Sequence, residues 1–282
     1  MPRVCLVCDL DGSLFQTLRG GGGPRDASLV PAALARDGRA LSFMTGRQAA
    51  FFGLLGTAGI AVPATARNLE SFGRVRLGFR HGAVLDFGGI VTGPGGEADR
   101  EWLAALDPAV REAAPLLERA LELAAGLARG NGLDAVPRLV GDLGRVYYMC
   151  VKSPSRDLGG LALLRDLLEG ALGDGARLHL NGNNLAVLPP FLDKAPAVEH
   201  YLARHLPWPR EETLVLGLGD SLSDLGFLGL CDYGVFPGGS QLAEALRPVR
   251  AAAPGAPGRV PAGGGPGAGS GLRPGGRRAG AR

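Results

Sequence analysis

Short apolar runs that stop at polar residues recur along this chain. The first, Val4-Cys5-Leu6-Val7-Cys8, is followed directly by Asp9. A continuous apolar run of this length predicts a strand buried on both faces, as in a parallel sheet. Two more such runs end at Thr45 and at Asp220. The pattern therefore predicts a parallel sheet whose strand ends carry polar side chains.

The stretches around these runs predict the other elements of the two ends of the chain. Apolar spacing, proline and turn residues are the signals used. They predict a short helix from Pro31 to Asp37-Gly38, a helix through Leu54-Leu55, a strand over 74–85, a helix beginning at Lys194, a strand from Tyr233 to Phe236 and a helix from Gln241 to Leu246.

The middle of the chain loses this alternation of strand and helix. Helical spacing over 100–129 and 158–172 is mixed with strand patterns over 145–151 and 185–188. An α+β domain inserted into an α/β core explains this change of rhythm. We therefore expect a Rossmann-like, three-layer core with a parallel sheet. The expected divisions are 1–85 and 191–250 for the core, 86–190 for the inserted domain and 251–282 for a tail.

Composition sets the tail apart from the rest of the chain. The formal net charge is +3, and the seven arginines from Arg247 onward, with no acid among them, leave −4 for residues 1–246. Residues 251–282 are almost entirely Ala, Gly, Pro and Arg and lack the apolar residues of a core, which predicts disorder. The tail lacks aromatic residues for base stacking, so a nucleic-acid partner is not expected.

Localisation and cysteine chemistry follow from simple patterns. No apolar stretch is long enough to span a bilayer and Met1-Pro2-Arg3 does not begin a signal peptide, so a cytoplasmic protein without a membrane partner is expected. Cys5 and Cys8 would point to opposite faces of one strand, and Cys150 and Cys231 stand alone. The thiols are therefore expected to be packed rather than to bind metal.

Carboxylates dominate the side chains expected at the strand ends. The residues predicted to converge there are Asp9, Asp11, Thr45, Asp220, Asp224 and, from the start of a helix, Lys194. Hard carboxylate oxygens without a nearby His or Cys cluster suit Mg²⁺, which binds phosphate as well. A carboxylate can also attack phosphorus and form an aspartyl-phosphate.

Most of these residues, taken singly, also fit a simpler role. A calcium loop beginning at Asp9 is disfavoured, because Leu14 and Gly20 stand where an EF-hand needs Gly and Glu. Thr45 and Asp224 are also good residues for the start of a helix. Lys194 alone would be a surface lysine. Asn181, Asn183 and Asn184 suit a turn as well as a sugar-binding surface.

Taken together, the motifs resemble the haloacid dehalogenase superfamily of phosphohydrolases. Asp9-Leu10-Asp11-Gly12-Ser13 is similar to the first family motif and Thr45-Gly46-Arg47 to the second. Lys194 matches the third motif, and Gly219-Asp220-Ser221-Leu222-Ser223-Asp224 the fourth. The insertion between the second and third motifs resembles the large type II (IIB) cap of sucrose-phosphate and trehalose-phosphate phosphatases.

The resemblance implies a role for each matched residue. Asp9 would be the nucleophile, and Asp11 would act as acid and base. Thr45, Gly46 and Lys194 would bind phosphate. Magnesium would be held by the residues Asp9, Asp11 (through its carbonyl) and Asp220, with Asp224 bound directly or through water.

The function implied is a magnesium-dependent phosphatase acting on a small phosphorylated metabolite, expected to be a sugar phosphate. A phosphomutase of the same fold is an alternative within the enzymes. A non-catalytic relative in stress response is another, because the ending of the chain resembles proteins found with tellurite-resistance systems. Ser13 and Ser223 depart from the commoner Thr and Asn of the family. The sequence does not indicate an oligomeric state.

Overall fold

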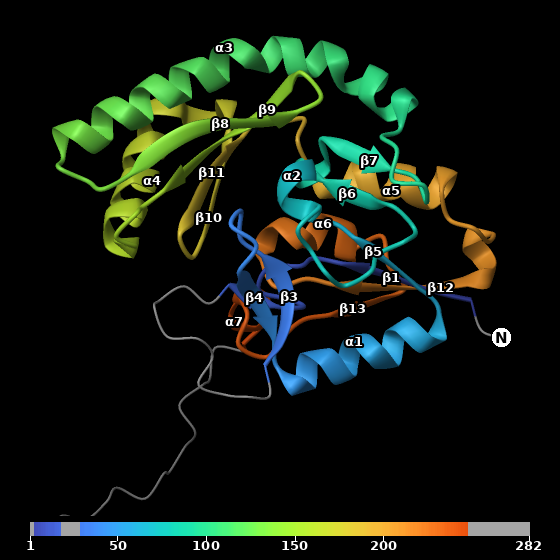
Figure 1. The fold of residues 1–282 in the computed structure, drawn as a ribbon. Helices are drawn as coiled ribbons and strands as arrows, with labels where there is room; N and C mark the ends of the chain where they lie inside the picture. Colours follow the sequence, from blue (N-terminus) through green and yellow to red (C-terminus); the bar gives the residue numbers. More distant parts are fainter. Residues whose placement is uncertain (1–2, 18–28, 248–282) are drawn as a thin grey trace, which may run out of the picture. The chain divides into compact units, whose positions relative to one another are not determined.

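A parallel sheet of four strands forms the centre of the core. The computed structural model describes residues 3–17 and 29–247. The strands, all parallel and in the order β13-β12-β1-β5, are β1 (Arg3–Cys8), β5 (Ile60–Pro63), β12 (Thr213–Leu218) and β13 (Tyr233–Val235) (Figure 1). Every residue of β1 after Arg3 is buried, as predicted for a strand covered on both faces. The expected strands before Asp9 and Asp220 are confirmed.

Helices cover both faces of this sheet, so the core has the expected three layers. On one face Val7 packs in a buried cluster with Val198 and Phe227, and on the other Leu6 packs with Leu55. The helices of the core are α1 (Gly46–Ala58), α2 (Leu69–Phe72), α5 (Lys194–Arg204), α6 (Leu225–Leu228) and α7 (Gln241–Ala245). Single 3₁₀ turns are η1 (Asp86–Gly88), η2 (Gly173–Gly175), η3 (Arg210–Glu212) and η4 (Leu222–Asp224).

A small antiparallel sheet stands where a helix was expected. The strands, in the order β2-β4-β3, are β2 (Gln16–Thr17), β3 (Val30–Leu34) and β4 (Ala40–Met44). The helix predicted from Pro31 is wrong, because Asp37-Gly38 closes a hairpin in which Gly38 has a φ of 82°. The run 40–44 is a strand, as predicted, but it does not join the parallel sheet.

A hairpin of β6 (Ala83–Leu85) and β7 (Ile90–Thr92) continues the core beside β5. The predicted strand over 74–85 is therefore largely wrong, because regular strand structure begins only at Ala83. Ala64 forms a parallel bridge to Val84, which packs with Val62 and Val91. We therefore propose that the inserted domain begins after this hairpin.

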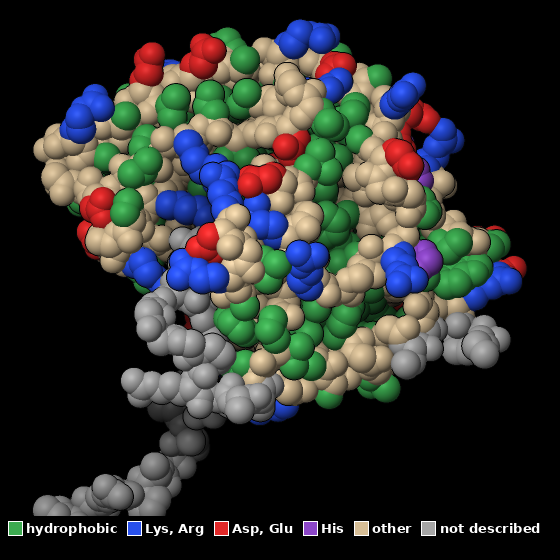
Figure 2. Space-filling view, viewed as in Figure 1, with side chains coloured by type: hydrophobic (Ala, Val, Ile, Leu, Met, Phe, Trp, Pro, Cys, Tyr) green, Lys and Arg blue, Asp and Glu red, His purple; other side chains and the backbone are tan. Residues whose placement is uncertain are grey.

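The inserted region is an antiparallel sheet covered by two helices. Its elements are α3 (Arg100–Gly130), β8 (Val136–Asp142), β9 (Arg145–Lys152), α4 (Leu158–Leu172), β10 (Arg177–Asn181) and β11 (Asn184–Leu188). The strand order is β10-β11-β9-β8. Leu117 of α3 and Leu164 of α4 share a buried cluster with Met149 of the sheet. The helices and strands predicted for the middle of the chain are confirmed. Charged side chains lie among apolar ones along the outer face of α3 (Figure 2).

The compact unit that contains both parts ends at Leu246. The Ala/Gly/Pro/Arg tail over 251–282 lies outside the described residues, as does the glycine run after β2. None of the described helices is long and apolar enough to cross a membrane. All four cysteines are free thiols, and Cys5, Cys8 and Cys150 are buried, as expected.

Candidate active site

The site begins at the carboxyl end of β1, where Asp9 follows the last strand residue. Asp9 is 6% exposed, and its backbone N–H donates to the carbonyl of Leu218 at 2.8 Å, which ties it to β12. Gly12, in the turn beyond it, has a φ of 98°. A Cβ at that position would lie 2.3 Å from Oδ2 of Asp220. Position 12 therefore requires glycine, both for its positive φ and for its close approach to Asp220.

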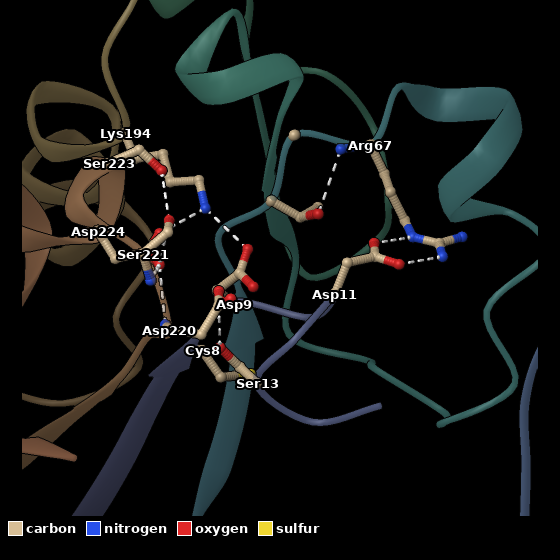
Figure 3. A network of polar contacts seen from close by, with 12 residues as sticks. Cys8, Asp9, Asp11, Ser13, Arg67, Lys194, Asp220, Ser221, Ser223 and Asp224 are labelled. Carbon is tan, nitrogen blue, oxygen red and sulfur yellow. Dashed lines mark hydrogen bonds and ion pairs between the residues drawn. The ribbon is translucent and has the colours of Figure 1, made fainter. Parts of the chain in front are cut away.

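Lys194 lies between two of the predicted acids. Its Nζ donates to Oδ1 of Asp9 at 2.8 Å and to Oδ1 of Asp224 at 2.7 Å (Figure 3). The lysine is 3% exposed although it opens α5, whose start is capped by the side chain of Asp193. Burial works to lower the pKa of Lys194, but the two carboxylates outweigh it and raise that pKa. The ammonium group is therefore kept charged inside the site.

Asp220 and Asp224 complete an acidic pocket around Asp9. One carboxylate oxygen from each of the three lies within 4.8 Å of the others. Burial raises the pKa of Asp9 and of Asp220, and the neighbouring Asp224 raises both further. Burial acts in the same sense on Asp224, but the ion pair with Lys194 outweighs it and lowers the pKa of Asp224. The single ammonium group does not balance three carboxylates.

The carboxylate oxygens of this pocket differ in the number of hydrogen bonds that they already accept. Oδ2 of Asp224 already accepts from the N–H groups of Asp220 and Ser221 and from the Ser221 hydroxyl, each at 3.0 Å. Oδ2 of Asp9 is buried and has no hydrogen-bond partner among the described residues. A buried carboxylate oxygen of this kind needs a cation or a donor. The pocket therefore fits a hard divalent cation, held by Asp9 and Asp220 first.

Asp11 is turned away from this pocket, toward a residue that the sequence did not suggest (Figure 3). Arg67 donates to both carboxylate oxygens of Asp11, from Nε at 2.6 Å and from an Nη at 2.8 Å. Its guanidinium also lies 5.1 Å from the ring centre of Phe15 and donates to the carbonyl of Ser71. Arg67 thus fixes the orientation of the Asp11 side chain.

Thr45 and Gly46 are not at the edge of the parallel sheet. The expectation that Thr45 ends a strand of that sheet is wrong, because β4 pairs with β2 and β3 instead. The Thr45 hydroxyl accepts from the N–H of Gln48 at 3.2 Å and forms a capping box with that side chain, while Gly46 is the first residue of α1. Thr45 is therefore the N-cap residue of α1, the simpler of the two roles that the sequence suggested for it.

Thr65 occupies the place expected for Thr45. It follows β5, which pairs with β1, and it is 1% exposed. The N–H of Arg67 donates to its hydroxyl at 3.2 Å, so Thr65-Ala66-Arg67 forms a tight turn at the strand end. The signal was present in the sequence, because this triplet has the same Thr-x-Arg form as Thr45-Gly46-Arg47 and follows the apolar run 60–63.

The comparisons with known proteins give structural relatives only. No protein-family model and no curated protein matches the chain. The trehalose-6-phosphate phosphatase C-terminal domain of C. albicans has a TM-score of 0.53 at 15% identity, and the match covers 81% of this chain and 72% of that one. A protein of Thermoplasma acidophilum has a TM-score of 0.50 at 14% identity, covering 87% and 89%. The chain has the haloacid dehalogenase fold.

A third solved structure is similar over most of its length. The sucrose-phosphatase of Synechocystis, in complex with sucrose and phosphate, has a TM-score of 0.48 at 18% identity and covers 87% of this chain and 86% of its own. At 14–15% identity, the two structures with TM-scores of 0.50 and 0.53 establish the fold alone.

In this haloacid dehalogenase fold the inserted sheet reaches the acidic pocket through one asparagine. Nδ2 of Asn181, at the end of β10, lies 3.5 Å from Oδ2 of Asp220. Asn183 instead bonds to the backbone of Ser153, both as donor and as acceptor, and so stabilises the turn itself. Only Asn181 of the two is therefore placed to meet a molecule bound beside Asp220.

Proposed function

We propose that the protein is a magnesium-dependent phosphatase that hydrolyses a small phosphorylated metabolite through an aspartyl-phosphate on Asp9. The observation that supports this proposal is the environment of the Asp9 carboxylate. It is buried at a strand end, one oxygen is held by Lys194, and the other has no partner among the described residues. A carboxylate presented in this way is positioned to attack phosphorus rather than to stabilise the core.

The first half of the reaction forms the phospho-enzyme. An oxygen of Asp9 attacks phosphorus as the bond to the leaving oxygen breaks. Asp11 delivers its proton to that oxygen, so the alcohol leaves neutral. The Thr65 hydroxyl and the Lys194 ammonium group bind the oxygens of the transferring phosphoryl group. In this mechanism Thr65 takes the role first expected for Thr45 and Gly46.

The second half returns the enzyme to its starting state. Asp11, now a carboxylate, takes a proton from water, and the hydroxide attacks phosphorus. The bond between phosphorus and the Asp9 oxygen breaks, which releases phosphate and restores the carboxylate. Both steps require Asp11 to leave the position in which Arg67 holds it, so substrate binding has to break a bidentate ion pair.

Magnesium would be held by Asp9, by the carbonyl of Asp11 and by Asp220. Both oxygens of Asp224 are taken, one by Lys194 and the other by Ser221 and its neighbours. We therefore expect Asp224 to act on the cation through water or by orienting Lys194. When bound, the ion would spread the negative charge of the transferring phosphoryl group.

A sugar phosphate is the proposed substrate. The trehalose-6-phosphate phosphatase of similar fold is named for such a substrate. In this chain the inserted sheet places Asn181 beside Asp220, and an amide side chain can donate to and accept from sugar hydroxyls. The sheet would act as a cap over the bound ester and exclude water until the alcohol leaves.

Substitution of the nucleophile tests the proposal. Asp9→Asn should lower magnesium-dependent phosphate release from an aryl phosphate by at least about 10³-fold, because the amide cannot form the phospho-enzyme. The control is Asp37→Asn, a substitution in the β3–β4 hairpin turn. Full activity of Asp9→Asn would contradict the mechanism.

The product of the reaction separates the alternatives. Release of inorganic phosphate from a panel of sugar phosphates supports a phosphatase, whereas transfer to another hydroxyl of a sugar bisphosphate would indicate a mutase. Magnesium binding without turnover of any ester in the panel would contradict both and favour a non-catalytic protein.

A further inference from the structure

A second cluster of ligand atoms lies where α3 begins and α5 ends. Asp99 is the N-cap residue of α3, His200 belongs to the last turns of α5 and His205 is its C-cap. One ligand atom from each lies within 4.8 Å of the others. Lys194 is at the opposite end of α5, about 9 Å along the helix axis from His200 and about 16 Å from His205 at 1.5 Å per residue. The cluster is therefore separate from the proposed phosphatase site.

The two imidazoles converge on one oxygen of the carboxylate. Nε2 of His200 lies 2.9 Å from Oδ2 of Asp99, and Nε2 of His205 lies 2.8 Å from the same atom. Oδ1 of Asp99 accepts from the N–H groups of Glu101 at 2.8 Å and Trp102 at 3.0 Å. The backbone thus fixes the carboxylate so that Oδ2 faces both rings.

Aromatic neighbours fix the directions of the rings. The ring centre of His200 lies 5.0 Å from that of Trp102, and the ring centre of His205 lies 5.6 Å from that of Tyr201. Trp102 is itself held by a hydrogen bond from its indole N–H to the carbonyl of Gly88. Side chains that are oriented before a ligand arrives lose little entropy when it binds.

We propose that Asp99, His200 and His205 form a binding site for a transition-metal ion, with Zn²⁺ as the best match. Two imidazole nitrogens and one carboxylate oxygen are a frequent protein ligand set for Zn²⁺, and they do not suit Mg²⁺, which prefers oxygen. Bonds of about 2.0–2.1 Å in a tetrahedron place ligand atoms roughly 3.3 Å apart. The distances from Oδ2 to the two nitrogens, 2.9 and 2.8 Å, each need to lengthen by only about half an ångström to reach that spacing.

The cluster also leaves room for a fourth ligand. The side chains of His200 and His205 are 16% and 20% exposed, and that of Asp99 is 10% exposed, so water can reach the ion from outside. Metal binding replaces two hydrogen bonds to Oδ2. Each neutral imidazole then carries its single proton on Nδ1 and presents the lone pair of Nε2 to the ion.

A bound ion would link the first turn of the inserted domain to the core. Arg204 and Glu101 already form an ion pair across the same junction. The ion would add three metal–ligand bonds between α3 and the end of α5, and a ligand that binds only the folded protein raises its thermal stability.

Metal titration of the intact protein tests the proposal, with excess Mg²⁺ present to occupy the acidic pocket. Isothermal titration calorimetry should show one equivalent of Zn²⁺ bound, and Co²⁺ should give the intense visible absorption of a tetrahedral complex. Asp99→Asn is the sharpest variant, because asparagine still caps α3 but replaces the charged ligand. We expect Asp99→Asn, His200→Gln and His205→Gln each to weaken Zn²⁺ binding by at least about tenfold.

His81→Gln is the matched control, since it removes a histidine outside the cluster and should leave Zn²⁺ affinity unchanged. Circular dichroism of each variant checks that the fold is retained. The proposal is overturned if the wild-type protein binds no Zn²⁺ in excess Mg²⁺, or if folded Asp99→Asn binds it with unchanged affinity and an unchanged Co²⁺ spectrum.

Discussion

Asp86 is a fully buried carboxylic acid in a left-handed backbone conformation. Its φ is 51°, and burial together with the neighbouring carboxylate of Asp142 raises its pKa to about 9. Neither oxygen of Asp86 has a hydrogen-bond partner among the described residues. At neutral pH the folded protein therefore keeps this carboxyl protonated. The unfolded chain loses the same proton above about pH 4. The stability that the protonated group contributes is thus present at low pH and is lost as the pH rises toward about 9.

Asp86→Asn should remove this pH dependence. The amide is neutral at every pH and so can stay buried without taking up a proton, and asparagine tolerates a positive φ. Relative to wild type, we expect the variant to gain about 4 kcal/mol in the free energy of unfolding between pH 5 and pH 8, because one proton separates the folded and unfolded states over these three pH units. Urea denaturation at the two pH values measures this change, with the surface substitution Glu122→Gln as control. An equal difference at both pH values would contradict the prediction.

At the scale of elements, two strands end in similar triplets but only one lies beside β1. Thr45-Gly46-Arg47 follows β4, which pairs locally through the β3–β4 hairpin, whereas Thr65-Ala66-Arg67 follows β5. The apolar pattern predicts a strand in both segments. It does not indicate which other strand each of them pairs with. The strands before Asp9 and Asp220 were predictable from their apolar runs, although Leu214 of β12 is exposed.

The two threonines should therefore differ in the effect of losing a hydroxyl. Thr65→Val should lower kcat/KM for an aryl phosphate by about 10²-fold, because a donor to the transferring phosphoryl group is lost. Thr45→Val should keep its activity and instead lose about 1 kcal/mol of stability through the α1 cap. Steady-state kinetics and urea denaturation of both variants check the pair, and the opposite pattern would return the phosphate-binding role to Thr45.

At the scale of the whole molecule, a few polar contacts fasten the inserted sheet to the loop that carries Thr65 and Arg67. The Tyr148 hydroxyl, from β9, donates to the carbonyl of Ala66 at 2.9 Å. Asp142, at the end of β8, accepts from the N–H of Leu69 at 2.6 Å. The neighbouring Tyr147 is also buried, but its hydroxyl has no partner among the described residues.

Neighbouring tyrosines thus provide a matched test of this attachment. Tyr148→Phe should lower the free energy of unfolding by about 1 kcal/mol, because the Ala66 carbonyl loses its donor. Tyr147→Phe should be neutral or stabilising, since it removes a hydroxyl that is desolvated without compensation. Denaturation curves of both variants measure the difference, and equal losses would show that the Tyr148 hydrogen bond contributes nothing.

The sequence by itself determined the class of the fold and most of its charged centre. Apolar runs ending in Asp9 and Asp220 predicted parallel strands, and the resemblance of Lys194 to the third family motif placed it with these acids. Local periodicity and end signals suffice for these features because they depend on residues close in the chain.

Only the tertiary structure decided which groups meet across long separations. It placed β5 rather than β4 beside β1, and so Thr65 rather than Thr45 at the site. It paired Asp11 with Arg67, and it joined Asp99 to two histidines about a hundred residues later. Strand pairing and side-chain convergence depend on the packing of the whole chain, and no local pattern records them.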